Sequence, residues 1–255
     1  MVITMSQKMN ENSSGYDPLG CSTAKSQSDF SVSSRVELIS KHYDLTGKRI
    51  LDFGCGNGIY TQEIAKKADW VLGIDIEEKR LQEAIKKNKQ ENLEFRNCGI
   101  EELEIDEKFD VVISIEVLEH VSNEDIVLEK IRDLLVDDGE IIFFVPNKLY
   151  PFETHGARIF GRNIHFRGSF PFLSWAPRFI RRFFVQERIY TKRRLKRLFL
   201  NHGFQVLEFD YWMPPLDKIN SRIARFVRKI LRIIERTPLK AFGISIFCVA
   251  RKDDL

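Results

Sequence analysis

Residues 51–58 read LDFGCGNG, an acidic residue followed by glycines at alternate positions. The apolar run before the glycines predicts a strand, and the stretch IYTQEIAKKA at 59–68 predicts a helix. A strand, a glycine-rich turn and a helix in this order bring backbone N–H groups and free space to a bound nucleotide or nucleoside. Each missing Cβ removes an obstacle to that approach. The glycines expected to line the ligand are Gly54, Gly56 and Gly58.

The acidic residues around this loop distinguish between ligands. A dinucleotide site needs GxGxxG and room for a pyrophosphate, whereas the spacing here is GxGxG. Asp52 would repel a pyrophosphate and attract a positively charged group. Asp75 ends the next predicted strand, where a carboxylate can accept hydrogen bonds from ribose hydroxyls, and Ile76 can pack on an adenine face. A cationic nucleoside without phosphates fits this description, and S-adenosylmethionine (SAM) is such a molecule.

Short apolar runs alternate with amphipathic stretches from Lys48 to Val145, which is typical of βα units around a parallel sheet. The pattern resumes after an interruption, with a helix that Thr191 can cap and Gly203 can end. We therefore expect an α/β fold with a Rossmann-like, mostly parallel sheet of seven strands and helices on both faces. The expected strands are 48–53, 70–75, 93–95, 109–115, 139–145, 204–212 and 242–252, and the expected helices are 59–68, 77–90, 123–136 and 192–202.

The interruptions in this pattern predict how the chain is organised. Its 255 residues, 43% of them hydrophobic, suit one main domain with additions. We expect a flexible N-terminal segment or lid at 1–33, a SAM-binding core at 34–147, an aromatic and basic cap at 148–190, and the rest of the core at 191–255 with an inserted basic helix at 219–236.

Cysteines and hydropathy indicate a compartment. The four cysteines share no CxxC spacing, so neither a disulfide framework nor a zinc site is expected. No stretch reaches the roughly 18 apolar residues of a membrane span. These features favour a protein of the reducing cytoplasm, peripheral to the inner face of a membrane if it binds one.

Charge is distributed unevenly along the chain. Residues 1–155 hold 18 Lys and Arg against 30 Asp and Glu, whereas residues 156–240 hold 20 against 5. Such asymmetry indicates an anionic partner, and the alternative is a solvated basic face. The stretch 219–236 has apolar residues at helical spacing among arginines, which is typical of a helix lying on anionic lipid or packed on its own domain. Nucleic acid is a weaker expectation, because no RNA-binding motif is present.

Four stretches carry a resemblance to a known family: ILDFGCGNGIYTQEIA, VLGIDIEEKRL, FDVVISIEVLEHV and LLVDDGEIIFFVPN. They resemble the successive motifs of class I SAM-dependent methyltransferases, in particular the small-molecule branch that includes ubiquinone-biosynthesis O-methyltransferases. The resemblance covers roughly residues 35–147 and resumes at 188–209. It implies that the three glycines line the methionine moiety, that Asp52 lies near its ammonium group, and that Asp75 takes the ribose hydroxyls.

The resemblance also implies further cofactor contacts. Ile115 would lie beside the sulfonium or the methionine, and Ile100 would cover the adenine. Where the family often has an Asp for the adenine amine, this chain has Gly99, so Asn97 or backbone groups are expected to recognise the adenine. Arg35 either approaches the cofactor carboxylate or is an exposed residue of an N-terminal helix.

The stretch SIEVLEHV follows the fourth predicted strand, at the edge where open α/β sheets bind ligands. If it begins a helical turn, Glu116 and His120 share a face, which makes His120 the leading candidate for a general base and Glu116 its orienting partner. Alternatively, this run only shapes the loop and contacts the cofactor. His155 is a second candidate base. A divalent metal held by Glu116, Glu119, Glu153 and His155 is an alternative that we do not adopt.

The expected function is transfer of a methyl group from SAM to a small, hydrophobic or lipid-linked acceptor, on oxygen, at an anionic membrane surface. One alternative is an RNA or protein methyltransferase that uses the basic half for its substrate. Another is a partner subunit that binds SAM without catalysis.

Overall fold

The computed structural model describes residues 29–153, 157–159, 162–164, 170–172, 175–177, 179, 188–213, 229–231 and 233–253. Its main sheet is built from seven strands that are far apart in the sequence. They are β1 (Arg49–Phe53), β2 (Trp70–Asp75), β3 (Leu93–Asn97), β4 (Phe109–Ile115), β5 (Leu135–Pro146), β10 (Phe204–Trp212) and β11 (Ser245–Lys252). Their order is β10-β11-β5-β4-β1-β2-β3, and β11 runs antiparallel to both of its neighbours. The predicted seven-stranded α/β sheet is therefore confirmed.

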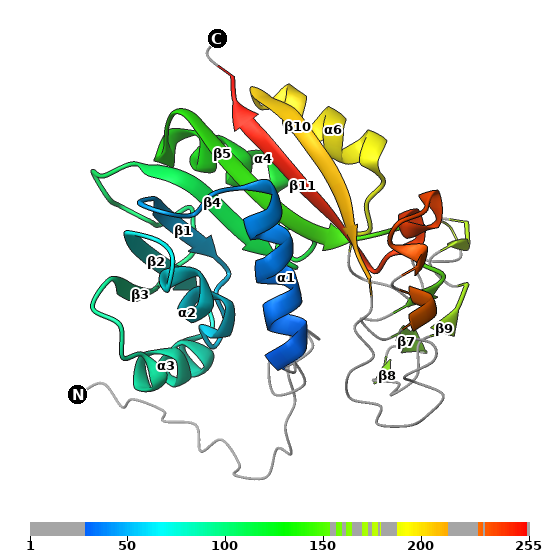
Figure 1. Cartoon of the computed structure of the whole chain (residues 1–255), viewed down its shortest axis with the longest axis horizontal. Helices are drawn as coiled ribbons and strands as arrows, with labels where there is room; N and C mark the ends of the chain where they lie inside the picture. Colours follow the sequence, from blue (N-terminus) through cyan, green and yellow to red (C-terminus); the bar gives the residue numbers. More distant parts are fainter. Residues whose placement is uncertain are drawn as a thin grey trace, which may run out of the picture.

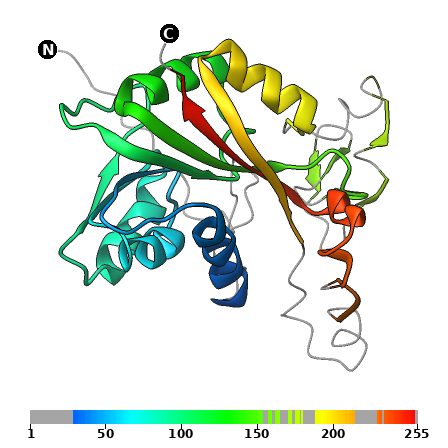
Figure 2. The same cartoon turned by 45° about the horizontal axis from the view of Figure 1, so that its top comes forward.

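Helices cover both faces of this sheet, as Figures 1 and 2 show. On one face α4 and α6 bury Leu128 and Phe199 in one core cluster, and on the other α1 and α2 bury Ile39 and Ile64 in a second. Burial of these side chains drives the layers together. The helices of the described core are α1 (Asp29–His42), α2 (Ile59–Ala65), α3 (Glu78–Lys87), α4 (Glu124–Leu134) and α6 (Lys192–Asn201).

Local sequence signals set most element ends. The Asn123 side chain accepts a hydrogen bond from the Asp125 N–H at the start of α4. Thr191 caps α6 in the same way, and Gly203 ends it with a positive φ of 71°. On α3, Leu81 and Ala84 are buried, whereas Ile85 is 45% exposed.

The N-terminal boundary differs from the prediction. Helix α1 begins at Asp29, inside the stretch 1–33 that we expected to be a flexible segment or lid. Three apolar positions of α1, at 32, 36 and 39, are buried in the core. The helix therefore belongs to the domain, and residues 1–28 lie outside the described residues.

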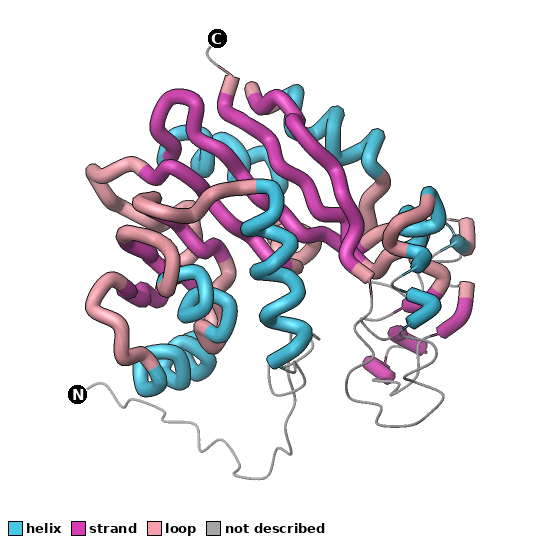
Figure 3. The backbone as a smooth tube through the Cα atoms, viewed as in Figure 1, coloured by secondary structure: helices cyan, strands magenta, loops and turns pink. Residues whose placement is uncertain are grey.

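The carboxyl ends of β1, β2, β4 and β5 meet at one edge of the sheet, from which the predicted cap departs (Figure 3). Asn147 ties the base of the cap to the core, since its amide donates to the carbonyls of Ala241 and Gly243, each at 2.8 Å. The short elements beyond it are β6 (Phe152–Glu153), β7 (Ala157–Ile159), β8 (Arg162–Ile164), β9 (Phe170–Pro171) and the 3-10 helix η3 (Pro238–Phe242).

Only part of the predicted helix 219–236 is described, with residues 229–231 and 233–234 helical. In the portion of the chain that the structure describes, no helix has the length and apolar character needed to cross a membrane.

Candidate functional site

The glycine loop after β1 is packed tightly against its neighbours. The Gly54 N–H donates to the Ile74 carbonyl at 2.9 Å, which fixes the loop over β2. A Cβ on Gly54 would lie 2.3 Å from the Val117 side chain, and one on Gly58 would lie 2.7 Å from the Phe95 ring. Both glycines have positive φ. Packing inside the protein therefore also requires these two glycines, besides the expected role of lining a ligand.

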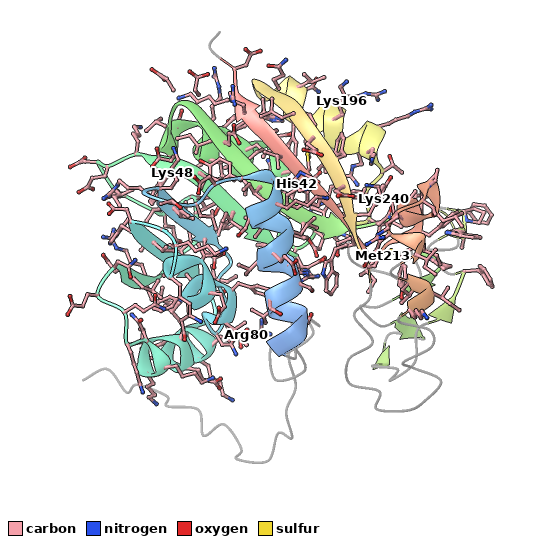
Figure 4. The ribbon with its side chains drawn as sticks, viewed as in Figure 1. His42, Lys48, Arg80, Lys196, Met213 and Lys240 are labelled. Atoms are coloured by element: carbon pink, nitrogen blue, oxygen red, sulfur yellow. The ribbon has the colours of Figure 1, made fainter. Side chains whose placement is uncertain are left out.

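Gly56 is the glycine of this loop that leaves open space. Among the described residues, a Cβ there would meet just the Arg80 side chain, at 4.0 Å (Arg80 is labelled in Figure 4). The Gly56 N–H donates to one carboxylate oxygen of Asp75 at 2.7 Å, and the Glu77 N–H donates to the other at 2.8 Å. The Asn97 amide donates to the Asp75 carbonyl at 2.8 Å. Asp75 is thus held rigidly at the end of β2, with lone pairs left for a ligand.

Asp52 lies beneath the loop and is 2% exposed. The Thr61 hydroxyl donates to it at 2.7 Å. Burial raises the pKa of Asp52 to about 7, and the nearby Asp75 carboxylate contributes in the same direction. Among the described residues no Lys, Arg or His forms an ion pair with it. A buried carboxylate of this kind favours a ligand that brings a positive charge.

The adenine side of the predicted site is only partly as expected. Ile76 is 67% exposed, so its side chain is open to a ligand. Ile100 has no exposed surface and packs in the core, so the expectation that it covers the adenine is corrected. Sequence reasoning missed Glu101 and Glu102, whose carboxylates surround Gly99: Glu101 lies 3.2 Å from the position of a Gly99 Cβ, and Glu102 accepts from the Gly99 N–H at 3.4 Å. The two consecutive glutamates in the sequence GIEEL at 99–103 are the pattern that could have indicated them.

Ile115, at the end of β4, is partly buried against the second core cluster. The residue after it, Glu116, has a positive φ of 57°, and this reverses the chain at the sheet edge. The His120 N–H donates to the Val117 carbonyl in a tight turn. The expected helical face shared by Glu116 and His120 is therefore wrong, because the chain forms a turn there.

Glu116 instead pairs with a residue that is distant in sequence. Its Oε1 accepts from the Arg35 guanidinium at 2.8 Å and from the Ser245 hydroxyl. Arg35 is 5% exposed and also donates to the Tyr60 hydroxyl at 3.2 Å, with its guanidinium 4.0 Å above the centre of the Trp212 ring. Of the two alternatives for Arg35, the exposed helix residue is ruled out.

Glu119 and His120 form the other side of this cluster. Glu119 is 3% exposed, and burial followed by the charge of Glu116 raises its pKa well above the usual range. The His120 Nε2 lies 3.9 Å from a Glu119 carboxylate oxygen. His120 is thus next to Glu119, not Glu116. His155 lies outside the described residues, and within the described ranges no group of three acidic, His or Cys side chains could hold a metal ion.

Comparison with known proteins agrees with this geometry. Residues 44–160 match the family described as "Methyltransferase domain". The chain is 36% identical over 120 residues to the ubiquinone biosynthesis O-methyltransferase of Neisseria meningitidis, an alignment that covers 45% of this chain and 50% of that protein. The chain thus spans about half the length of the curated relatives it matches.

Solved structures share the fold over more of the chain. An S-adenosylmethionine dependent methyltransferase from Mesorhizobium loti superposes with a TM-score of 0.60 and 18% identity, covering 85% of this chain and 96% of that one. The magnesium protoporphyrin IX methyltransferase from Synechocystis with bound S-adenosylhomocysteine (SAH) gives a TM-score of 0.55 at 18% identity, covering 87% and 81%.

The match over residues 44–160 shows a methyltransferase domain in this part of the chain, and the solved structures share its fold, as the motifs implied. SAM is accordingly its cofactor. Within that class, the domain is similar to the ubiquinone biosynthesis O-methyltransferases of the small-molecule branch.

Proposed function

We propose that this chain transfers a methyl group from SAM to an oxygen of a small, hydrophobic or lipid-linked acceptor. The observation that carries the proposal is the juxtaposition of two sites at one sheet edge. The open Gly56 position with Asp75 forms one, and the cluster of Glu116, Glu119 and His120 forms the other. Ligands of open α/β folds bind at this edge.

The chemistry of the donor set fits SAM. Asp75 would take the ribose hydroxyls, and Ile76 would pack on the adenine, whose amine Glu101 or Asn97 would bind. Asp52 would balance the ammonium group. Of the described cationic side chains, just that of Arg80 comes near Gly56, and it does so with its aliphatic part. The carboxylates of Asp52 and Asp75 would repel a phosphate. When bound, the cofactor supplies an activated methyl group on a sulfonium.

Catalysis then depends on positioning and on removal of one proton from the acceptor. Holding the acceptor in line with the methyl group in a buried site supplies most of the rate enhancement. We propose His120 as the base for an acceptor hydroxyl, with Glu119 rather than Glu116 as its neighbour. Glu116 holds the turn in place through Arg35 and Ser245.

An exposed apolar surface on the segments that follow β5 and precede β11 supports a hydrophobic acceptor. We call it the aromatic surface. It comprises side chains that are 41–59% exposed: Leu149, Phe172, Trp175, Leu239 and Phe242.

The rings of this surface are contiguous. The centre of the Trp175 ring lies 5.2 Å from that of Phe172 and 6.3 Å from that of Phe242. The Trp175 indole donates to the Leu149 carbonyl at 3.2 Å. Exposed aromatic side chains of this kind are typical of interaction sites.

Charge favours an anionic lipid surface as the partner. Three residues of the aromatic surface, Phe172, Trp175 and Leu239, belong to the stretch 156–240, which holds 20 Lys and Arg against 5 Asp and Glu. Two exposed cations, Lys148 and Arg236, lie in the segments that form it. Aromatic anchors beside basic side chains suit the interface of a membrane with anionic headgroups. A lipid-linked acceptor would meet the catalytic edge there.

A labelled-methyl assay tests the proposal. The full chain is incubated with methyl-labelled SAM and either a membrane lipid extract or total RNA, and label is counted in each. We expect counts in the organic phase of the lipid extract. Label in RNA alone would show that the acceptor is RNA and not a lipid. Binding of SAM with no label in either extract would favour a non-catalytic subunit.

A further inference from the structure

The last residues of the predicted cap lie against the turn that carries His120. The Arg188 guanidinium donates to two backbone carbonyls of this turn, those of Val121 and Ser122, the second at 3.1 Å. These carbonyls belong to the first two residues after His120. A side chain that is distant in the sequence therefore holds the backbone directly beside the candidate base.

The turn depends on support of this kind, because it contains little regular structure of its own. Residues 116–123, between β4 and α4, form neither helix nor strand. The His120 N–H donates to the Val117 carbonyl at 2.9 Å, which closes the turn at one point. Carbonyl groups that no helix or sheet takes up need other donors. The planar fork of an arginine side chain can supply two at once.

Tyr190 fixes the segment from which Arg188 reaches the turn. Its N–H donates to the Pro146 carbonyl, at the end of β5, at 2.9 Å. Its side chain has no exposed surface, and its hydroxyl lies 2.6 Å from a Glu124 carboxylate oxygen and 3.2 Å from the Leu118 carbonyl. Arg188 is thus attached to the sheet on one side and to the turn on the other.

We propose that Arg188 is a positioning residue, which holds the turn so that the His120 ring faces the acceptor hydroxyl. This inference rests on the proposed function, which assigns His120 as the base. Without the guanidinium the turn loses both of its bonds to Arg188, and the ring moves relative to the acceptor. A displacement of about 1 Å can lower a rate by about 100-fold. The end of the predicted cap would in this way contribute to proton removal.

The NMR signal of the His120 ring tests the positioning without an acceptor. It is assigned as the signal that is missing from His120→Gln. Arg188→Met should shift this signal, and Arg188→Lys, which keeps a cationic donor, should shift it less.

A matched control is Arg132→Met. Arg132 also donates to a backbone carbonyl, that of Asp253 at 3.3 Å, but it does so from the opposite end of α4. This change should leave the His120 signal in place and the rate of methyl transfer within about twofold of that of the unmodified chain.

Methyl transfer to a membrane lipid extract tests whether Arg188 acts through His120. With saturating methyl-labelled SAM, Arg188→Met should lower the rate about tenfold to 100-fold, while SAH affinity in calorimetry changes less than about twofold. His120→Gln should lower the rate about 100-fold. Adding Arg188→Met to His120→Gln should lower it further by less than about twofold, because no base is left to position.

Three results would overturn the inference: an unmoved ring signal in Arg188→Met, an unchanged rate in that variant, or the full additional loss in the double variant. Melting curves check folding. If Arg188→Met fails to fold, Tyr190→Phe, which keeps the ring and loses the hydroxyl, takes its place in each measurement.

Failure of the proposed function gives different results. A full rate in His120→Gln would overturn the assignment of the base, and this inference with it. If the unmodified chain labels no extract, the proposed methyl transfer is wrong, and the ring signal alone decides whether Arg188 positions His120.

Discussion

The two regions of this chain, 44–147 and 148–244, use charge and burial in opposite ways. In the first region acidic side chains are buried at the sheet edge, as Asp52 at 2% and Glu119 at 3% exposure show. In the second, aromatic side chains such as Phe172 and Trp175 remain exposed beside basic residues. The buried acidic side chains of the first region suit a small cationic cofactor, whereas the exposed aromatic side chains of the second region suit contact with a partner outside the protein. Under the proposed function, the cofactor and the acceptor would therefore be selected by different physical means.

The largest effect is expected at Asp75. Asp75→Ala removes the acceptor of the Gly56 and Glu77 N–H groups as well as the partner of the ribose hydroxyls. SAM affinity should fall by at least about 100-fold in calorimetry, since two hydrogen bonds to a carboxylate are lost together. Retained affinity would contradict the assignment of the first region to the cofactor.

Packing of the glycine loop gives the next largest effect. Gly54→Ala combines strain at a φ of 79° with a clash against Val117, and the free energy of unfolding should fall by about 2–5 kcal/mol. Gly47→Ala is the matched control, because Gly47 also has positive φ but no atom of the described residues lies within 4 Å of its Cβ position. It should cost only about 1–2 kcal/mol. Denaturant unfolding measures both, and equal losses would refute the packing argument.

The second region is tested by Trp175→Ala. Removing this aromatic anchor should reduce partitioning onto anionic liposomes by about tenfold in co-sedimentation at physiological salt. Leu200→Ala is the control, since Leu200 is 50% exposed on α6, away from the aromatic surface. Equal binding of both variants to the liposomes would contradict the proposal that the aromatic surface binds a membrane.

The smallest effect is a pH dependence that comes from Asp52. A carboxyl whose pKa is raised to about 7 in the folded protein holds a proton that the unfolded chain has lost, so its contribution to stability declines from about pH 4 to pH 7. The ammonium of SAM binds the ionised form, and affinity should fall about fivefold from pH 7 to pH 6. Asp52→Asn should remove this difference, as calorimetry at both pH values would show. An unchanged pH profile in that variant would assign the effect to another group.

The comparison also explains what the sequence could predict. Strands β2, β4 and β10 have the predicted bounds, and the cap at Thr191 is as predicted, because the signals for each element lie within a few residues of one another.

Other features depend on contacts between distant segments. The ion pair of Arg35 with Glu116 joins residues 81 positions apart in the sequence. The positive φ that prevents a helix at Glu116 belongs to a residue other than glycine, so the sequence gives no sign of it. An apolar residue suits both contact with an adenine and packing in the core, so the sequence does not distinguish these roles for Ile100. The structure does, because the Ile100 side chain has no exposed surface left for a ligand. The aromatic surface is hardest to predict, because exposure of an aromatic side chain is decided by tertiary structure.

A crystal structure of the chain soaked with SAH tests the central claim most directly. The account predicts the ribose hydroxyls on Asp75, the adenine beside Ile76 and Glu101, and the amino group directed to Asp52. Binding of SAH elsewhere, or with its ribose away from Asp75, would contradict the assignment of this sheet edge as the cofactor site.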